Sequence, residues 1–507
     1  MRAWFRAAAV AICLAALTAL ILVLVQPNLD PAKIQTLPLV AGAWLVFAVA
    51  MFLLFKAPVQ LALPLILIGA FAVQIAALSA PPAQSTDLYR YIWDGRVQAA
   101  GVDPYAYQPD AEALVSLRNE FLWSDTKSRA YGYCVTPATH PGVPALDPVP
   151  GCTRINRPFV PTIYPPVAEA YFLSVQLVAP SDTSTTPIQA AAAAIAIATT
   201  LILLFGLASL GKDIRWAALW AWCPTVALEA GNNAHVDVLA VMITALALLV
   251  LARTRTRKRT LLGGVLLGLA IATKMTPVLT VPAVLRRRRW VLLVASAVAA
   301  VVTVYIPHVI AVGSRVLGYL PGYLQENGYG SGSRFGLLDL IFKDKPAAAI
   351  AVLVLAATAY LVLRRGDPDQ PWHGAMIMTG VALAVTTPLY QWYALLLVML
   401  VALDGQWEWL GLAAGAYVYA EPSTGSLALP DPQALGYGLG LALALTGFWI
   451  RYRRRPARRL TPLTPLPVRV PGAIFALGPP GTSTPSGSTP SPSPEPAGTY
   501  ATTSAGA

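Results

Sequence analysis

Apolar runs long enough to cross a bilayer recur along most of this chain, and they constrain its fold more than any other feature. A helix of about 20 apolar residues spans a membrane with its backbone groups paired internally. With 56% apolar and 12% charged residues, the chain is not a soluble globule of ordinary composition. We therefore expect an all-α, polytopic transmembrane protein with about twelve spans. The expected spans are residues 7–25, 37–55, 58–79, 188–210, 216–230, 236–252, 290–311, 346–363, 374–388, 390–404, 409–420 and 432–450.

Four clusters of basic residues beside apolar runs set the expected orientation. They comprise residues 253–259, 286–289, 364–365 and 451–459. Such clusters stay on the cytoplasmic side, where they meet anionic membrane lipid. The net charge of +12 therefore indicates topology and not a nucleic-acid partner. Counting spans from these clusters predicts a multi-pass protein of the cell membrane whose loop at residues 80–162 is external.

Two further apolar segments are not expected to be full crossings. Residues 163–179 contain Pro165, Pro166 and Glu169, and counting them as a span would place a basic cluster outside. We expect an external or partly inserted helix there. Residues 261–285 have basic residues at both ends, so they should begin and end inside, and two legs of this length are too short to span. A re-entrant helical hairpin turning near Lys274 fits better.

Residues 1–459 are expected to form one transmembrane domain. Residues 460–507 are rich in Pro, Ser and Thr and cannot bury a core, so they predict a disordered cytoplasmic tail. Cys134 and Cys152 share the long external loop, and an oxidising compartment would allow them to pair. The sequence leaves a disulfide and two free thiols equally open.

The stretch from Ser85 to Tyr105 crowds charges and aromatic residues directly after the third apolar run. Asp87 in this stretch suits a general base for a hydroxyl group, and it also suits the start of a helix. In a helix, Asp87, Arg90 and Asp94 share one face. Arg90 would then orient the two carboxylates or bind a phosphate, although the same pattern describes a surface ion-pair ladder.

A second polar group, residues 232–237, lies between two apolar runs, where charge is expensive and usually functional. Asn233, His235 and Asp237 would hydrogen-bond sugar hydroxyls or cap a helix; two ligands at the His235–Asp237 spacing are a weak metal signal, and we expect no metal. Lys274 lies within an apolar segment, so it needs a partner. A lipid-linked phosphate and Asp237 are equally suitable.

Arg334 belongs to an external loop, residues 313–335, that also carries Arg315 and several tyrosines and glycines. Mobile glycines beside an arginine suit a loop that closes around an anionic substrate. The same composition describes an ordinary flexible connector. Gly-x-Gly in this loop is not a nucleotide fingerprint, because no strand precedes it.

Together, these motifs resemble the polytopic GT-C glycosyltransferases of actinobacteria, in particular the polyprenol-phosphate-mannose-dependent α-mannosyltransferases of phosphatidylinositol-mannoside and lipoglycan assembly. The resemblance covers approximately residues 2–455. The motifs that carry it are Asp87-Leu-Tyr-Arg-Tyr-Ile-Trp-Asp-Gly-Arg96, Asp103-Pro-Tyr105, Ile163-Tyr-Pro-Pro166, Asn232-Asn-Ala-His-Val-Asp237 and Gly268-Leu-Ala-Ile-Ala-Thr-Lys274. The first is fairly specific, whereas the third and the last occur across the wider superfamily. Here the first long loop follows three spans instead of the single span common in the superfamily.

The resemblance implies that Asp87 deprotonates an acceptor hydroxyl, which displaces a polyprenyl phosphate with inversion at the sugar carbon. Lys274 or Arg334 would bind the leaving phosphate, and the scheme requires no metal or other cofactor. The implied substrates are a polyprenyl-phosphate sugar donor and a glycolipid or glycan acceptor on the outer face of the membrane. A transporter or flippase of lipid-linked glycans would use similar charges without bond chemistry. A non-catalytic protein of cell-envelope assembly is a further alternative.

Overall fold

The computed structural model describes residues 2–26, 36–123, 153–252, 256–285, 288–420 and 432–454. Within these ranges the secondary structure is helical, with no strand and one isolated antiparallel bridge between Trp123 and Thr153. The predicted all-α fold is thus confirmed. Residues 1–454 form one compact unit. Cys134, Cys152 and the proposed tail at 460–507 lie outside the described residues.

In the part of the chain that the structure describes, seven helices are long and apolar enough to cross a membrane, or eight if one bent helix pair is a single span. The seven are α1 (Arg2–Leu24), α2 (Thr36–Lys56), α3 (Val59–Ala77), α6 (Thr186–Ser209), α11 (Trp290–Val312), α14 (Lys345–Arg365) and α18 (Pro432–Arg454). The span of α11 continues through η5 (Gly313–Leu317) and α12 (Leu320–Glu326). The bent pair is η3 (Val226–Asn232) with α8 (Asp237–Leu251). The span expected at residues 216–230 is instead divided among η2 (Ile214–Ala217), α7 (Ala218–Ala221) and η3.

Three other expected spans are shorter helices. They are α15 (Pro371–Thr386), η6 (Gln391–Ala394) with α16 (Leu395–Asp404), and η7 (Trp407–Trp409) with α17 (Leu410–Ala420). All residues from Leu395 to Leu403 are buried inside the protein. A short helix covered on every side needs apolar residues just as a lipid-facing span does, so hydropathy alone does not separate the two.

The expected re-entrant segment contains α9 (Arg257–Ile271), η4 (Thr276–Thr280) and α10 (Val281–Val284). The helix break between α9 and η4 includes Lys274, where the sequence predicted the turn. A Cβ atom at Gly268 would lie 2.3 Å from the carbonyl oxygen of Ala297 on α11. Only glycine allows α9 to approach α11 this closely, and the approach fixes the end of the helix that leads to Lys274.

The helix expected at residues 163–179 is α5 (Pro166–Val178), which is too short to span. Pro166 occupies its first turn, where a missing N–H group costs no hydrogen bond. The N–H of Val167 donates to the carbonyl oxygen of Ala272 at 3.0 Å, which joins α5 to the end of α9. The start of α5 and the break at Lys274 are therefore neighbours.

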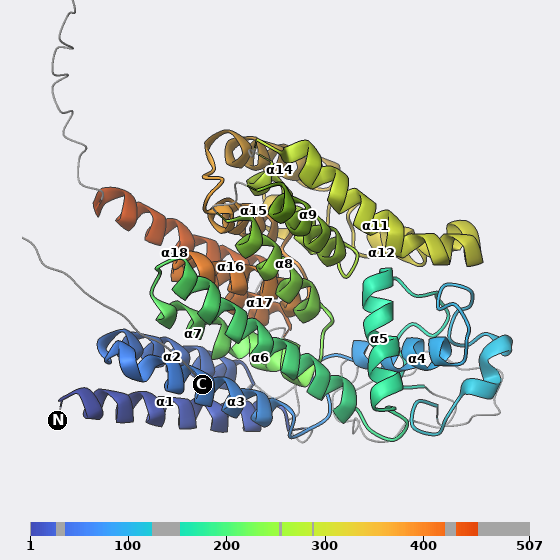
Figure 1. The fold of residues 1–507 in the computed structure, drawn as a ribbon, viewed down its shortest axis with the longest axis horizontal. Coiled ribbons are helices and arrows are strands. Elements are labelled where there is room, and N and C mark those ends of the chain that lie inside the picture. Colours follow the sequence, from blue (N-terminus) through green and yellow to red (C-terminus); the bar gives the residue numbers. More distant parts are fainter. Residues whose placement is uncertain are drawn as a thin grey trace, which may run out of the picture. The chain divides into compact units, whose positions relative to one another are not determined.

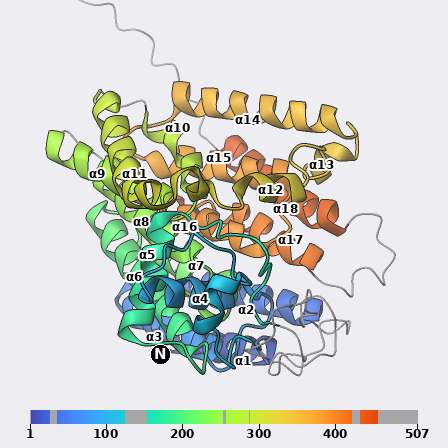
Figure 2. The ribbon, with the colours of Figure 1, turned by 90° about the vertical axis from the view of Figure 1, so that its right-hand side faces the viewer.

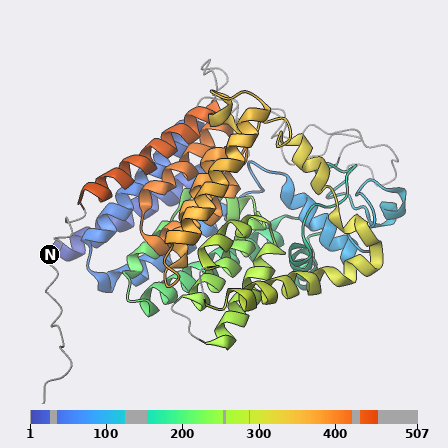
Figure 3. The same ribbon diagram turned by 90° about the horizontal axis from the view of Figure 1, so that it is seen from above.

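The polar segments gather at one end of the long helices. In Figure 1, α4 (Asp87–Ala99), the 3-10 helix η1 (Glu112–Leu117) and α5 lie at the right-hand end, close to α12. Figure 2 views this end directly, with α4, α5 and α12 in front of the bundle, and Figure 3 shows the same grouping from above. The short helix α13 (Gly336–Asp339) follows the loop at residues 313–335, called the second polar loop below, and packs against α14, α15 and α18.

Candidate active site

The site is built around an interruption between η3 and α8. The two helices meet at an angle of 115°, and Ala234 between them has φ +52°, a left-handed conformation that a non-glycine residue rarely adopts. The whole of η3 is π-helical, which is common at functional sites. This interruption turns His235 out of regular helix and places Asp237 in the first turn of α8.

Asn232 and Asn233 bind the backbone that leads into α4. Asn232 Oδ1 accepts from the N–H of Ala83 at 2.8 Å, and Asn233 Oδ1 accepts from the N–H of Gln84 at 3.2 Å. The Asn232 amide also donates to the carbonyl oxygens of Ala77, Ala80 and Pro81. These bonds place the segment before Asp87 against the helix interruption.

Replacing Asn232 by Ala is expected to destabilise the protein, because the N–H of Ala83 and the carbonyl oxygens of Ala77 and Pro81 each lose a hydrogen bond, whereas that of Ala80 keeps one from Gln189. One buried unsatisfied group costs about 1–3 kcal/mol. Thermal unfolding in detergent should show the loss. Thr358→Ala, which removes only a hydroxyl bonded within α14, should change the unfolding temperature little. An unchanged unfolding temperature for Asn232→Ala would contradict the tethering role.

Asp87 begins α4, and its side chain is 18% exposed. Its backbone N–H donates to the Ser85 hydroxyl at 3.2 Å, so Ser85 helps to start the helix. The Asp87 carboxylate faces away from this turn. Its Oδ1 accepts from Nδ2 of Asn156 at 2.5 Å, and its Oδ2 lies 3.9 Å from Nδ1 of His235.

His235 is fully buried beside this carboxylate. Its ring stacks on Trp392 at 3.8 Å between centroids, and Trp392 stacks in turn on Tyr390 at 4.5 Å. His235 Nε2 lies 3.5 Å from Oε2 of Glu229. Glu229 itself accepts hydrogen bonds from Asn233 and from the hydroxyl of Tyr417. The imidazole ring is thus fixed between an aromatic stack and two carboxylates.

Lys274 and Asp237 form an ion pair, with 2.9 Å between Nζ and Oδ2. The protein partner considered for Lys274 is therefore present in the fold. The ammonium group lies 5.5 Å from the ring centre of Tyr164 and 5.9 Å from that of Tyr393. Asp87 is within electrostatic reach of both members of the pair. The structure therefore brings Asp87, His235, Asp237 and Lys274 to one place.

Arg334 is buried, with 3% of its surface exposed, and Arg315 of the same loop is exposed. The Arg334 guanidinium lies 5.4 Å from the ring centre of Tyr329 and near Tyr393. Within the described part of the chain its Nε and Nη1 atoms have no hydrogen-bond partner. A buried cation with free N–H groups is costly unless an anion binds it. Tyr393 lies between Arg334 and Lys274.

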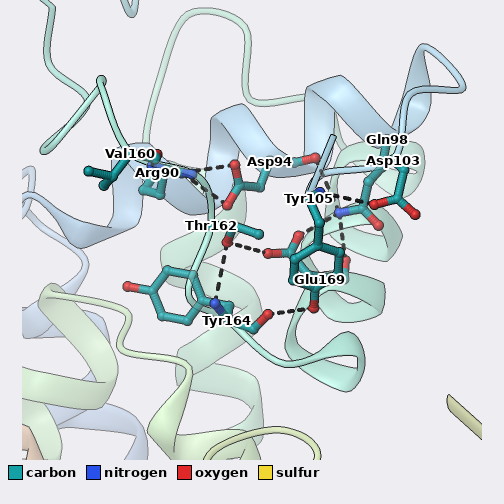
Figure 4. Close-up of polar contacts among 9 residues, drawn as sticks. All are labelled: Arg90, Asp94, Gln98, Asp103, Tyr105, Val160, Thr162, Tyr164 and Glu169. Carbon is teal, nitrogen blue, oxygen red and sulfur yellow. Dashed lines mark hydrogen bonds and ion pairs between the residues drawn. The ribbon is translucent and has the colours of Figure 1, made fainter. Parts of the chain in front are cut away.

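Arg90 and Asp94 form the ion pair expected from their spacing, but both are buried. Arg90 Nε donates to both Asp94 oxygens, at 2.9 and 3.1 Å, and its Nη1 donates to the carbonyl oxygen of Val160. Figure 4 shows Asp94 turned toward Thr162 and Glu169. This placement ties α4 to the segment that carries Val160 and Thr162, and among the described residues Nη2 of Arg90 has no hydrogen-bond partner.

Glu169 completes this buried network. Its two oxygens accept from the Thr162 hydroxyl at 2.7 Å and from the Gln98 amide at 2.8 Å. Burial and the neighbouring Asp94 carboxyl raise the pKa of Glu169 well above its ordinary value of 4.5. Because Arg90 favours the ionised form of Asp94, we assign the proton of the pair to Glu169.

The free energy of unfolding should therefore contain a component that falls as pH rises. The folded protein binds the Glu169 proton more tightly than the unfolded chain, so the component is full below pH 4.5 and is lost as pH rises through the raised pKa. Glu169→Gln, which mimics the protonated acid, should remove this component from a plot of unfolding temperature against pH. Glu120→Gln, at an exposed carboxylate, should keep it. A Glu169→Gln profile parallel to wild type would contradict the assignment.

Several residues of the site were not predicted from the sequence. Glu229 is a lone carboxylate in an apolar run, and this position alone could have predicted a functional residue. Trp392 resembles any aromatic residue of an apolar helix, and Asn156 resembles any polar loop residue. Among the described residues, no group of three or more His, Cys, Asp or Glu side chains is arranged to hold a metal ion.

Comparison with known proteins identifies a glycosyltransferase family model that matches part of the chain. The family model of glycosyltransferase family 87 matches residues 162–385. The matched region contains His235, Asp237, Lys274 and Arg334, and it begins after Asp87. No curated protein and no solved structure matches significantly. Together with the membrane-type helices, the match supports a membrane glycosyltransferase.

Proposed function

We propose that this protein transfers a sugar, mannose by its resemblance, from a polyprenyl-phosphate donor to a glycolipid or glycan acceptor. The transfer takes place on the outer face of the cytoplasmic membrane, where the basic clusters orient the α4 end of the protein. The observation that carries the proposal is the partly exposed carboxylate of Asp87 close to the Lys274–Asp237 ion pair, with the buried cation Arg334 near Tyr393, whose ring centre lies 5.9 Å from Lys274.

Asp87 acts as the general base. Its carboxylate accepts the proton of an acceptor hydroxyl while the hydroxyl oxygen attacks the anomeric carbon of the donor sugar. The new bond joins this carbon to the acceptor oxygen, and the bond that breaks joins it to the phosphate oxygen. The electron pair of the broken bond leaves with the polyprenyl phosphate, and attack from the opposite side inverts the anomeric carbon.

The leaving group sets the demand for cations. A polyprenyl-phosphate sugar is a phosphodiester with one negative charge, and the released monoester gains a second charge as the bond breaks. Groups that bind this developing charge stabilise the transition state more than the ground state. Among the described residues, the Nε and Nη1 groups of the buried Arg334 have no hydrogen-bond partner, whereas the charge of Lys274 is shared with Asp237. Arg334 is therefore the principal phosphate ligand.

The configuration of the product tests this chemistry. Purified protein supplied with a β-linked polyprenyl-phosphate mannose, radiolabelled in the sugar, should yield an α-mannoside that an α-mannosidase cleaves. Parallel donors carrying glucose or galactose should react more slowly. A β-linked product would contradict single displacement, and equal use of the three donors would contradict mannose specificity.

A further inference from the structure

Asn156 contacts the proposed base directly. A carboxylate only accepts hydrogen bonds, so the side-chain nitrogen of Asn156 must be the atom that faces Asp87 Oδ1, at 2.5 Å. The other carboxylate oxygen, Oδ2, lies on the side of His235. The bond therefore fixes one oxygen of Asp87 and leaves the other to receive a proton.

The segment that carries Asn156 is anchored to α4 on both sides of it. On one side, the Arg154 guanidinium lies 5.9 Å from the ring centre of Tyr89 on α4 and 5.0 Å from that of Phe121. On the other side, Arg90 of α4 donates to the carbonyl oxygen of Val160 at 3.1 Å. Asn156 is thus held over the first turn of α4, where Asp87 lies, before any substrate binds.

The next residue, Arg157, joins this segment to the second polar loop. It has φ +45°, a left-handed conformation that needs support in a non-glycine residue. Its guanidinium pairs with Glu326 at 2.5 Å, and the Tyr319 hydroxyl donates to the same carboxylate at 3.0 Å. Glu326 ends α12, so the second loop holds Arg157 in this conformation.

The segment that carries Asn156 and the second polar loop also meet through their backbones. The N–H of Tyr319 donates to the carbonyl oxygen of Thr162 at 3.2 Å. Gly318 has φ +53°, and a Cβ atom there would lie 1.8 Å from the same oxygen, so a side chain would separate the loops. The Arg157–Glu326 pair is therefore part of a continuous contact between the two loops.

We infer that Asn156 is a positioning residue that orients the Asp87 carboxylate, and that the Arg157–Glu326 ion pair holds Asn156 in place. This inference rests on the proposed function, because it needs Asp87 to be the base. The Asn156 N–H holds Oδ1, so that Oδ2 meets the acceptor hydroxyl in one orientation.

Two substitutions at Asn156 separate orientation from packing. Asn156→Ala should lower kcat roughly 10- to 100-fold and leave both KM values near wild type, because Asn156 touches the base and not the substrate. Asn156→Asp keeps the shape of the side chain but places a second carboxylate against Asp87. Ionising both carboxylates at this distance is costly, because their charges repel each other. It should be slower than Asn156→Ala at neutral pH and recover as pH rises.

The ion pair is tested by a double-mutant cycle on kcat. Arg157→Ala and Glu326→Ala, whose side chains are 30% and 43% exposed, should each lower kcat about two- to fivefold, and the double variant should lower it no further, since both remove the same contact. Lys343→Ala, which removes an exposed ion pair with Asp339 in the same part of the chain, should leave kcat unchanged.

The outcomes distinguish this inference from the proposed function. Wild-type kcat in Asn156→Ala, or an Asn156→Asp variant faster than Asn156→Ala at neutral pH, would overturn the inference if Asp87→Asn is inactive. Additive losses in the double-mutant cycle would overturn the role of the ion pair. Full activity of Asp87→Asn would instead overturn the proposed base. Unfolding temperatures of Asn156→Ala and of the ion-pair variants should stay close to wild type.

Discussion

Replacing Asp87 by Asn is expected to lower sugar transfer by about 10²- to 10⁴-fold, which is the usual contribution of a general base. The amide keeps the size of the carboxylate but does not take a proton from the acceptor hydroxyl. Because only one of the carboxylate oxygens is bonded to Asn156, the change should leave the fold of α4 intact. Initial rates with a radiolabelled polyprenyl-phosphate mannose, normalised to the amount of protein in the membrane, give the measurement.

Asp182→Asn is the matched control for this experiment. Asp182 pairs with Arg96 of α4 at the same end of the protein, but its side chain is 48% exposed and belongs to a surface ion pair. The control should transfer at the wild-type rate. Transfer by Asp87→Asn at that rate would contradict the assignment of the base. An equal loss of transfer in both variants would show that the loss comes from a disturbed structure at this end of the protein.

Replacing Arg334 by Met is expected to separate stability from activity. We expect kcat/KM for the donor to fall about 10²- to 10³-fold, as when one preorganised ligand of a developing charge is removed. Because the guanidinium is buried with free N–H groups, an apolar side chain should leave the unfolding temperature unchanged or raise it. Polyprenyl phosphate should raise the unfolding temperature of the wild type more than that of the variant.

Arg315→Met changes an exposed arginine of the same loop and should change neither kcat/KM for the donor nor the unfolding temperature. A marked fall in the unfolding temperature of Arg334→Met would show that Arg334 is a structural residue of the loop. Wild-type kcat/KM in that variant would show that the phosphate binds elsewhere, and Lys274 would then be the remaining cation of the site.

The long helices could be predicted closely from the sequence. The span expected at residues 37–55 is α2 (Thr36–Lys56), and the one expected at 188–210 is α6 (Thr186–Ser209). These helices follow directly from the length and composition of their apolar runs. The break at Lys274 was also predictable, because basic residues at both ends of its segment exclude a full crossing.

The short helices and the contacts of the site required the structure. The hydropathy of Leu395–Asp404 predicts a helix that is shielded from water, but it does not distinguish a helix surrounded by lipid from one surrounded by protein. The spacing of four residues between Arg90 and Asp94 predicted their ion pair, but it did not predict that the pair is buried. The contacts of Asp87 with Asn156 and of His235 with Trp392 join residues far apart in the chain, so no local pattern encodes them.

The most direct test of the central claim reconstitutes the purified protein in liposomes that contain radiolabelled polyprenyl-phosphate mannose and a glycolipid acceptor. Sugar transfer predicts that the label leaves the donor and appears in a glycosidic bond of the acceptor, together with an equal amount of free polyprenyl phosphate. Wild-type protein should do this and Asp87→Asn should not. Intact donor that crosses the bilayer, with no labelled acceptor, would contradict the account and indicate a flippase.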